Sequence, residues 1–210
     1  MFNDHGKPAQ GIVMLRMIGC LFAAASAVVG SSAAAADAYR IEPSHVDVLF
    51  SANHMGFSNT HGFFRKIDGT LSFDPDDVTR SQVDVTIDAT SLDTKHALRD
   101  AHLKGADFFD VTNHPTIRLV SRKITQAGEN ALRLEGDLTL RGITRPVMLD
   151  FRINRIGINP FGKRPTIGVS ASGSLKRSDF GMTGFTTSVS DEVKLTIDVE
   201  FTRVDPQQTP

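Results

Sequence analysis

Residues 45–73, HVDVLFSANHMGFSNTHGFFRKIDGTLSF, form the stretch from which the fold can be worked out. Apolar and polar residues alternate on both sides of a short loop rich in Gly, Ser, Asn and His, which is typical of two half-buried strands. We expect the apolar face to be one wall of a ligand pocket and the loop to lie at its mouth. The residues assigned to this face are Val48, Phe50, Ala52, His54, Phe63, Ile67, Leu71 and Phe73.

Six further segments alternate in the same way, and turn residues rather than long linkers separate them. These segments are 82–88, 116–124, 131–140, 146–156, 166–177 and 192–203. Eight alternating strands in one uninterrupted region predict an all-β fold, an eight-stranded antiparallel barrel. A barrel of about eight strands either packs solid or encloses one small ligand, and alternation alone does not decide between these. If a ligand is enclosed, further lining is expected from Leu138, Leu140, Leu149, Phe151, Val169 and Phe180.

Residues 89–110 interrupt the strand pattern and predict one helix of about three turns between strands. Ser91 or Thr94 could cap its N-terminus, and Gly105 is a suitable stop. The apolar residues at helical spacing are Ala97, Leu98 and Ala101.

Polar residues on this predicted helix have two interpretations. Arg99 and Asp100 could form an exposed salt bridge, or Arg99 or His102 could tie the helix to the strand loops. The adjacent Phe108 and Phe109 are expected to anchor the segment against the sheet.

The N-terminus, residues 1–38, has the features of a cleaved secretory signal peptide. Lys7 and Arg16 precede an apolar run over 17–30, and small residues follow up to a predicted cleavage site before Tyr39. The run is shorter than the roughly 20 residues of a spanning helix, so no stable membrane insertion is expected after cleavage. The sequence therefore predicts a periplasmic protein whose mature domain is residues 39–210.

Cleavage also removes Cys20, the only cysteine of the chain. The mature domain would then contain no disulfide, no thiolate nucleophile and no Cys-ligated metal site. Its stability must come from packing alone.

Composition and motifs exclude several other functions. The formal net charge of -1 gives no sign of a nucleic-acid partner. No HExxH pair occurs, and neither His54 with His61 nor His96 with His102 has the spacing of two metal ligands on neighbouring turns. Nucleophile elbows, dinucleotide-binding loops and P-loops are also absent from the sequence. A carrier of an apolar ligand, rather than an enzyme, is the hypothesis that remains.

His54 is the one polar residue on the predicted inner face. It could contact the head group of a ligand at the pocket mouth, or it could be a rim histidine hydrogen-bonded only to backbone. The sequence leaves both interpretations open.

Many short blocks along residues 39–204 resemble the YceI-like proteins of bacteria. They include Tyr39-x-Ile41-x-Pro43-x-His45, His54-Met55-Gly56, Gly69-Thr70-Leu71, Arg99-Asp100-Ala101-His102, Asp107-Phe108-Phe109-Asp110, Gly142-Ile143-Thr144-Arg145-Pro146 and Arg177-Ser178-Asp179-Phe180-Gly181. The resemblance implies a lipocalin-like barrel with a helix and an apolar tunnel that holds a polyisoprenoid chain, such as an isoprenoid quinone or a polyprenyl lipid. No cofactor other than this bound lipid is implied. The resemblance also implies a secreted and often dimeric protein, which in some cases is linked to stress.

The competing hypothesis is a quinone-linked enzyme or electron-transfer accessory. It would need a titratable group at the tunnel mouth, and His54 and His61 are the candidates. The segment 58–61 departs from the family pattern, which puts the head-group preference in doubt but not the fold.

Overall fold

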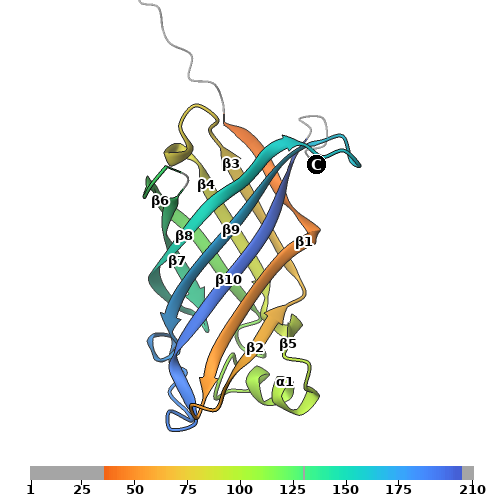
Figure 1. The fold of residues 1–210 in the computed structure, drawn as a ribbon. Coiled ribbons are helices and arrows are strands. Elements are labelled where there is room, and N and C mark those ends of the chain that lie inside the picture. Colours follow the sequence, from red (N-terminus) through yellow and green to blue (C-terminus); the bar gives the residue numbers. More distant parts are fainter. Residues whose placement is uncertain (1–35, 130, 205–210) are drawn as a thin grey trace, which may run out of the picture. The chain divides into compact units, whose positions relative to one another are not determined.

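The computed structural model describes residues 36–129 and 131–204, so the predicted signal peptide lies almost wholly outside the described residues. Ten strands form one antiparallel sheet, which closes because β1 pairs with β10 (Figure 1). The strands are β1 (Asp37–His54), β2 (Ser58–Phe64), β3 (Ile67–Phe73), β4 (Gln82–Asp88), β5 (Leu92–Asp93), β6 (Thr116–Gln126), β7 (Leu132–Leu140), β8 (Ile143–Ile158), β9 (Pro165–Lys176) and β10 (Val189–Arg203).

The barrel has a circumference of eight strands, as predicted, because β2 and β3 occupy one position in the wall. The first half of β1 pairs with β3 through residues 37–40, and its second half pairs with β2 through residues 49–54. β5 adds only a two-residue edge to β2. The prediction of an eight-stranded antiparallel barrel with one helix between strands is therefore confirmed.

The junction between β2 and β3 changes the phase of the wall. In β2 the buried residues are Gly62 and Phe64, whereas in β3 they are the odd-numbered positions from Ile67 to Phe73. Arg65 and Lys66 lie outside both strands and absorb the shift. The prediction that residues 63–73 form one strand with a single inward face was wrong. Two charged residues divide this segment into two strands of opposite phase.

Gly62 lies directly beneath the ring of Phe50. A Cβ atom on Gly62 would be 2.3 Å from Cζ of Phe50, well inside van der Waals contact. The absence of a side chain at this position therefore allows the phenyl ring to pack against the backbone of the neighbouring strand.

The helix α1 (Ala97–Lys104) is shorter than predicted, with eight residues or about two turns. Its N-cap is His96, whose Nδ1 accepts a hydrogen bond from the backbone N–H of Arg99 at 3.2 Å. Ser91 lies in a 3-10 turn, η2 (Ala89–Ser91), so the predicted caps at Ser91 and Thr94 are wrong. Gly105 is the C-cap, as predicted.

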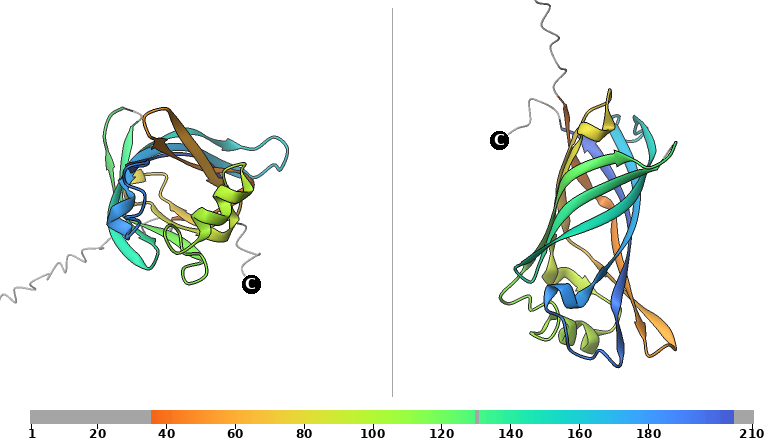
Figure 2. Two further views of the ribbon diagram at one scale, coloured as in Figure 1. Left: turned by 90° about the horizontal axis from the view of Figure 1, so that it is seen from below. Right: turned by 90° about the vertical axis from the view of Figure 1, so that its left-hand side faces the viewer.

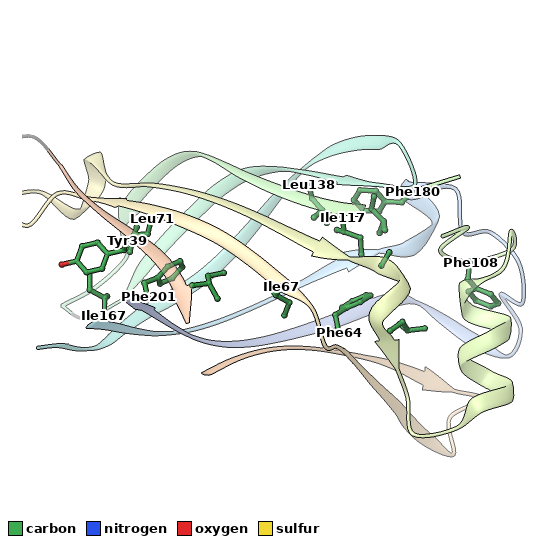
Figure 3. Close-up of a cluster of buried hydrophobic side chains, with 14 of the residues drawn as sticks. Tyr39, Phe64, Ile67, Leu71, Phe108, Ile117, Leu138, Ile167, Phe180 and Phe201 are labelled. Carbon is green, nitrogen blue, oxygen red and sulfur yellow. The ribbon is translucent and has the colours of Figure 1, made fainter. Parts of the chain in front are cut away.

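Successive connections alternate between the two ends of the barrel (Figure 2). The helix end carries the β1–β2 turn, the α1 segment, the β7–β8 turn and the β9–β10 loop, which begins with η3 (Arg177–Phe180). The hairpin end carries the β3–β4 connection with η1 (Val78–Arg80), the β6–β7 turn and the β8–β9 hairpin. The core runs between these ends, from Tyr39 to Phe108 (Figure 3).

Candidate functional site

The barrel interior contains a cavity of about 250 Å³. All strands except β5 contribute to its wall, together with residues from η1, α1 and the β9–β10 loop. Every lining side chain is apolar except those of Ser81 and Arg177. Because water needs several polar partners to remain in a cavity, a space lined in this way favours an apolar occupant.

Eleven of the fourteen candidate residues predicted from alternation lie on the cavity wall. They come from five strands and share an inward orientation in the sheet. They are Val48, Phe50, Ala52, Ile67, Leu71, Phe73, Leu138, Leu140, Leu149, Phe151 and Val169. Their contact with a ligand stays a prediction.

Three candidates do not lie on the wall. Phe63 points outward, where the guanidinium of Arg65 lies 5.0 Å from its ring centroid, because the phase in β2 is opposite to that in β3. Phe180 is 1% exposed but packs in η3 outside the cavity, since the chain has left the strand there. His54 is exposed at the end of β1, where a register shift against β10 interrupts the alternation.

His61, the other residue of the enzyme hypothesis, is also exposed and pairs with Ser51 on the outer part of the sheet. Neither histidine lines the cavity. The described residues therefore bring no imidazole to the wall of the candidate site.

An aromatic cluster that alternation did not reveal lines the cavity at the helix end. Phe50, Phe64 and Phe109 have ring centroids 5.7 to 6.0 Å apart. Phe64 was missed because of the phase change in β2, and Phe109 because it lies in a loop. The charged pair Arg65 and Lys66 was the sequence signal that could have placed Phe64 inside.

Arg177 is the one charged residue on the cavity wall and is only 3% exposed. Its guanidinium donates to four backbone carbonyls, those of Met182 (2.6 Å), Gly184 (2.7 Å), Ser190 (3.0 Å) and Val189 (3.1 Å). Four of its five N–H groups are thus bonded to backbone, two to the β9–β10 loop and two to the start of β10. Arg177 therefore holds the β9–β10 loop in place where it closes the cavity at the helix end.

Asp191 supports the same loop from the side. Its carboxylate accepts hydrogen bonds from the backbone N–H of Ser178 (2.9 Å) and from Oγ of Ser178 (2.8 Å). Burial raises the pKa of Asp191, but the two hydrogen bonds and the nearby charge of Arg177 outweigh burial and lower the pKa below its usual value. The carboxylate therefore stays ionised beside η3 at neutral pH.

The polar residues of α1 hold the helix to the chain that precedes it. Arg99 donates to Oγ1 (2.8 Å) and to the backbone carbonyl (2.7 Å) of Thr94, and Asp100 accepts from the Thr94 backbone N–H at 2.8 Å. Of the two interpretations left open, the structure supports the one in which Arg99 ties the helix to a loop. The ring of His102 packs edge-on against Phe108 and Phe185, with centroids 5.1 Å away in both cases.

Residues 36–129 and 131–204 contain neither a metal-binding cluster nor a membrane-spanning helix. No group of three or more His, Cys, Asp or Glu side chains is placed to hold a metal ion. No helix in this part of the chain is both long and apolar enough to cross a membrane.

Comparison with known proteins gives one consistent match. The YceI-like domain matches residues 39–201. Protein YceI of Shigella flexneri is 38% identical over 184 residues, which cover 88% of this chain and 95% of that protein. The crystal structure of BcnA from Burkholderia cenocepacia is similar with a TM-score of 0.69 and 26% identity, covering 76% of this chain and 98% of that one.

A more distant structure shares the fold alone. It is described as a polyisoprenoid binding domain from Saccharophagus degradans implicated in plant cell wall breakdown. The TM-score is 0.63 at 11% identity, with 80% of this chain and 99% of that chain covered.

Proposed function

This chain belongs to the YceI-like domain family, and we propose that it binds the apolar chain of a polyisoprenoid, such as an isoprenoid quinone or a polyprenyl lipid, inside its barrel. The observation that carries the proposal is the cavity, whose wall is apolar from one end of the barrel to the other apart from two side chains. The same fold in a protein described as polyisoprenoid-binding is consistent with it.

The physical driving force is the removal of the lipid chain from water. Each buried methylene contributes about 0.8 kcal/mol, and the wall offers branched aliphatic and aromatic side chains along its whole length. The two polar residues on the wall lie near its ends, Ser81 after η1 and Arg177 in η3, so the middle of the cavity offers no polar side chain to a head group. We therefore place the head group at an end of the barrel.

We further propose that the protein acts in the periplasm as a non-enzymatic carrier. An isoprenoid chain is nearly insoluble there, so a protein that shields it can serve transport, storage or protection under stress. The exposed positions of His54 and His61 away from the cavity wall fit a binding role better than a quinone-linked reaction.

The decisive experiment identifies the bound molecule. The secreted protein is purified without added lipid, extracted with organic solvent and examined by mass spectrometry, and an isoprenoid is expected in the extract. The stripped protein should then gain roughly 5–10 °C in melting temperature with quinone at about 100 times its dissociation constant. An empty extract together with an unchanged melting temperature would overturn the proposal.

A pair of neighbouring substitutions tests whether the cavity is the binding site. Ala171→Phe places a ring in the cavity, whereas Ser172→Phe places the same ring on the outer face of β9. We expect Ala171→Phe to lower the amount of bound lipid at least about tenfold, which corresponds to about 1.4 kcal/mol, and Ser172→Phe to leave it unchanged. Circular dichroism verifies that both variants fold. Equal lipid content in the two folded variants would place the binding site elsewhere.

A further inference from the structure

The β8–β9 hairpin projects beyond the barrel wall at the hairpin end (Figures 1 and 2). Ile156 pairs with Ile167, and Ile158 pairs with Pro165, so both isoleucines lie on the face that continues the inner wall of the barrel. Ile167 is 1% exposed, but Ile156 and Ile158 are 54% and 59% exposed because the barrel no longer covers them. The hairpin thus carries an apolar face out into solvent.

The tip of the hairpin exposes one more large apolar side chain in an ordered turn. Phe161 is 95% exposed. The Asn159 side chain accepts a hydrogen bond from the backbone N–H of Phe161 at 3.0 Å, and the Lys163 N–H donates to the Asn159 carbonyl at 2.8 Å. The phenyl ring is therefore presented by a fixed backbone, which reduces the conformational entropy lost on binding.

Within the hairpin itself, all charged side chains are basic. Residues 151–164 contain four basic residues and no acidic residue. The basic residues are Arg152, Arg155, Lys163 and Arg164. All four are exposed, and among the described residues no carboxylate lies within 4.0 Å of their charged groups. The acidic β3–β4 connection at the same end of the barrel differs, because Nε of Arg80 lies 2.8 Å from the carboxylate of Asp74 and 3.8 Å from that of Asp77.

An apolar tip surrounded by cations matches the chemistry of an anionic lipid membrane surface. The apolar side chains can enter the boundary between head groups and acyl chains, while Lys and Arg remain at the level of the phosphates. We propose that the β8–β9 hairpin docks the protein reversibly on anionic membranes. The contact is peripheral, and it brings one end of the barrel to the surface in which isoprenoid lipids dissolve.

The helix end also exposes apolar residues but lacks this charge pattern. Met55, Phe57 and Phe185 are 56%, 85% and 49% exposed. Near Phe185, His102 lies 3.9 Å from the exposed carboxylate of Asp107, so acidic and basic groups are mixed there. Charge complementarity with anionic lipid therefore favours the β8–β9 hairpin.

The test is co-sedimentation of the full mature protein with vesicles. Binding is expected with mixed phosphatidylethanolamine and phosphatidylglycerol vesicles, and it should be weak with phosphatidylcholine alone and fall with salt. We expect Phe161→Ser to weaken binding at least about fivefold, and the double variant Lys163→Glu with Arg164→Glu at least about tenfold, since each surface cation contributes about fivefold.

Matched controls use the same changes elsewhere on the barrel. Phe57→Ser alters an equally exposed turn at the helix end, and Lys123→Glu reverses a charge on the outer wall of β6. Both should bind like the parent protein. The proposal is overturned if the parent does not bind anionic vesicles, or if Phe57→Ser loses as much binding as Phe161→Ser. It is equally overturned if light scattering shows a dimer that Phe161→Ser dissociates while vesicle binding is unchanged, because the hairpin would then be a self-association contact.

Discussion

The two ends of the barrel are closed by different kinds of interaction. At the helix end, Arg177, Arg99 and Arg141 donate to backbone carbonyls in the connections between strands, those of Met182, Thr94 and Ala106. Aromatic rings pack at both ends, as Tyr39 does on Phe73 at the hairpin end with centroids 6.1 Å apart, but the two longest connections, β4–β6 and β9–β10, lie at the helix end. Long connections need side-chain donors to satisfy their buried carbonyls, whereas short turns leave few such groups. We therefore expect the replacement of a single polar residue to lower the stability of the protein most when that residue lies at the helix end.

The largest effect is expected from Arg177→Met. The substitution leaves four backbone carbonyls of the β9–β10 loop and the start of β10 without their donor, and the free energy of unfolding should fall by about 3–5 kcal/mol. Urea unfolding followed by circular dichroism measures the change. The control is Arg152→Met on the outer face of β8, which should change the stability by less than about 0.5 kcal/mol. Equal effects for the two would mean that the buried guanidinium does not hold the loop.

Adding a methyl group should also destabilise the helix end more than the hairpin end, but the difference in unfolding free energy should be smaller. Gly62→Ala forces the ring of Phe50 out of the aromatic cluster at the helix end, which we expect to cost about 1–3 kcal/mol. Gly162→Ala at the hairpin end meets no heavy atom within 4 Å and should be nearly neutral. Thermal unfolding of both variants checks the difference, and a neutral Gly62→Ala would show that the ring can move without loss.

Acid should weaken the helix end through Asp191. Its pKa is lowered in the folded protein, so the unfolded chain takes up a proton first as the pH falls below about 4. The stability that this carboxylate contributes is present above that pH and is lost below it. Asp191→Asn should lower stability at neutral pH by about 1 kcal/mol, and its unfolding free energy should depend less on pH between neutral and acidic solution. Parallel pH curves for parent and variant would contradict this.

The smallest effect is expected on the outer side of α1. Leu98 is 79% exposed, so Leu98→Ser removes almost no packing and should change stability by less than about 0.5 kcal/mol. Chemical denaturation measures this directly. A loss of more than about 1 kcal/mol would show that this face of the helix is covered in solution.

Period-two alternation was sufficient to predict the barrel because each strand buries one face and exposes the other. It correctly placed Val48, Phe50 and Ala52 in β1, Leu138 and Leu140 in β7, and Leu149 and Phe151 in β8, all of which lie on stretches without a register shift. It failed at Phe63, Phe180 and His54, which lie next to a phase change, in a 3-10 turn and beside a register shift. Such local irregularities depend on backbone geometry, which the alternation of apolar and polar residues does not reveal.

The role of Arg177 could not be derived from the sequence for a different reason. A basic residue just after a strand usually lies in solvent, whereas the four acceptors of Arg177 lie in the β9–β10 loop and at the start of β10, up to thirteen positions away. The short α1 likewise depends on His96 as N-cap, a residue that is rarely chosen for this position. The first feature depends on how the chain folds back on itself, and the second is a local cap formed by an uncommon residue type.

The pairing of β1 with β10 has a consequence for how the protein forms. Tyr39 lies opposite Arg203, and Asp37 and Arg203 form an ion pair at 3.2 Å, so the first and last strands close the wall together. Contacts between such distant parts of the chain make folding slow. Until β10 has emerged and docked, β1 and β9 present open edges that can pair with other chains. The time between synthesis of the first strand and closure by the last is therefore the period in which this protein is most exposed to aggregation.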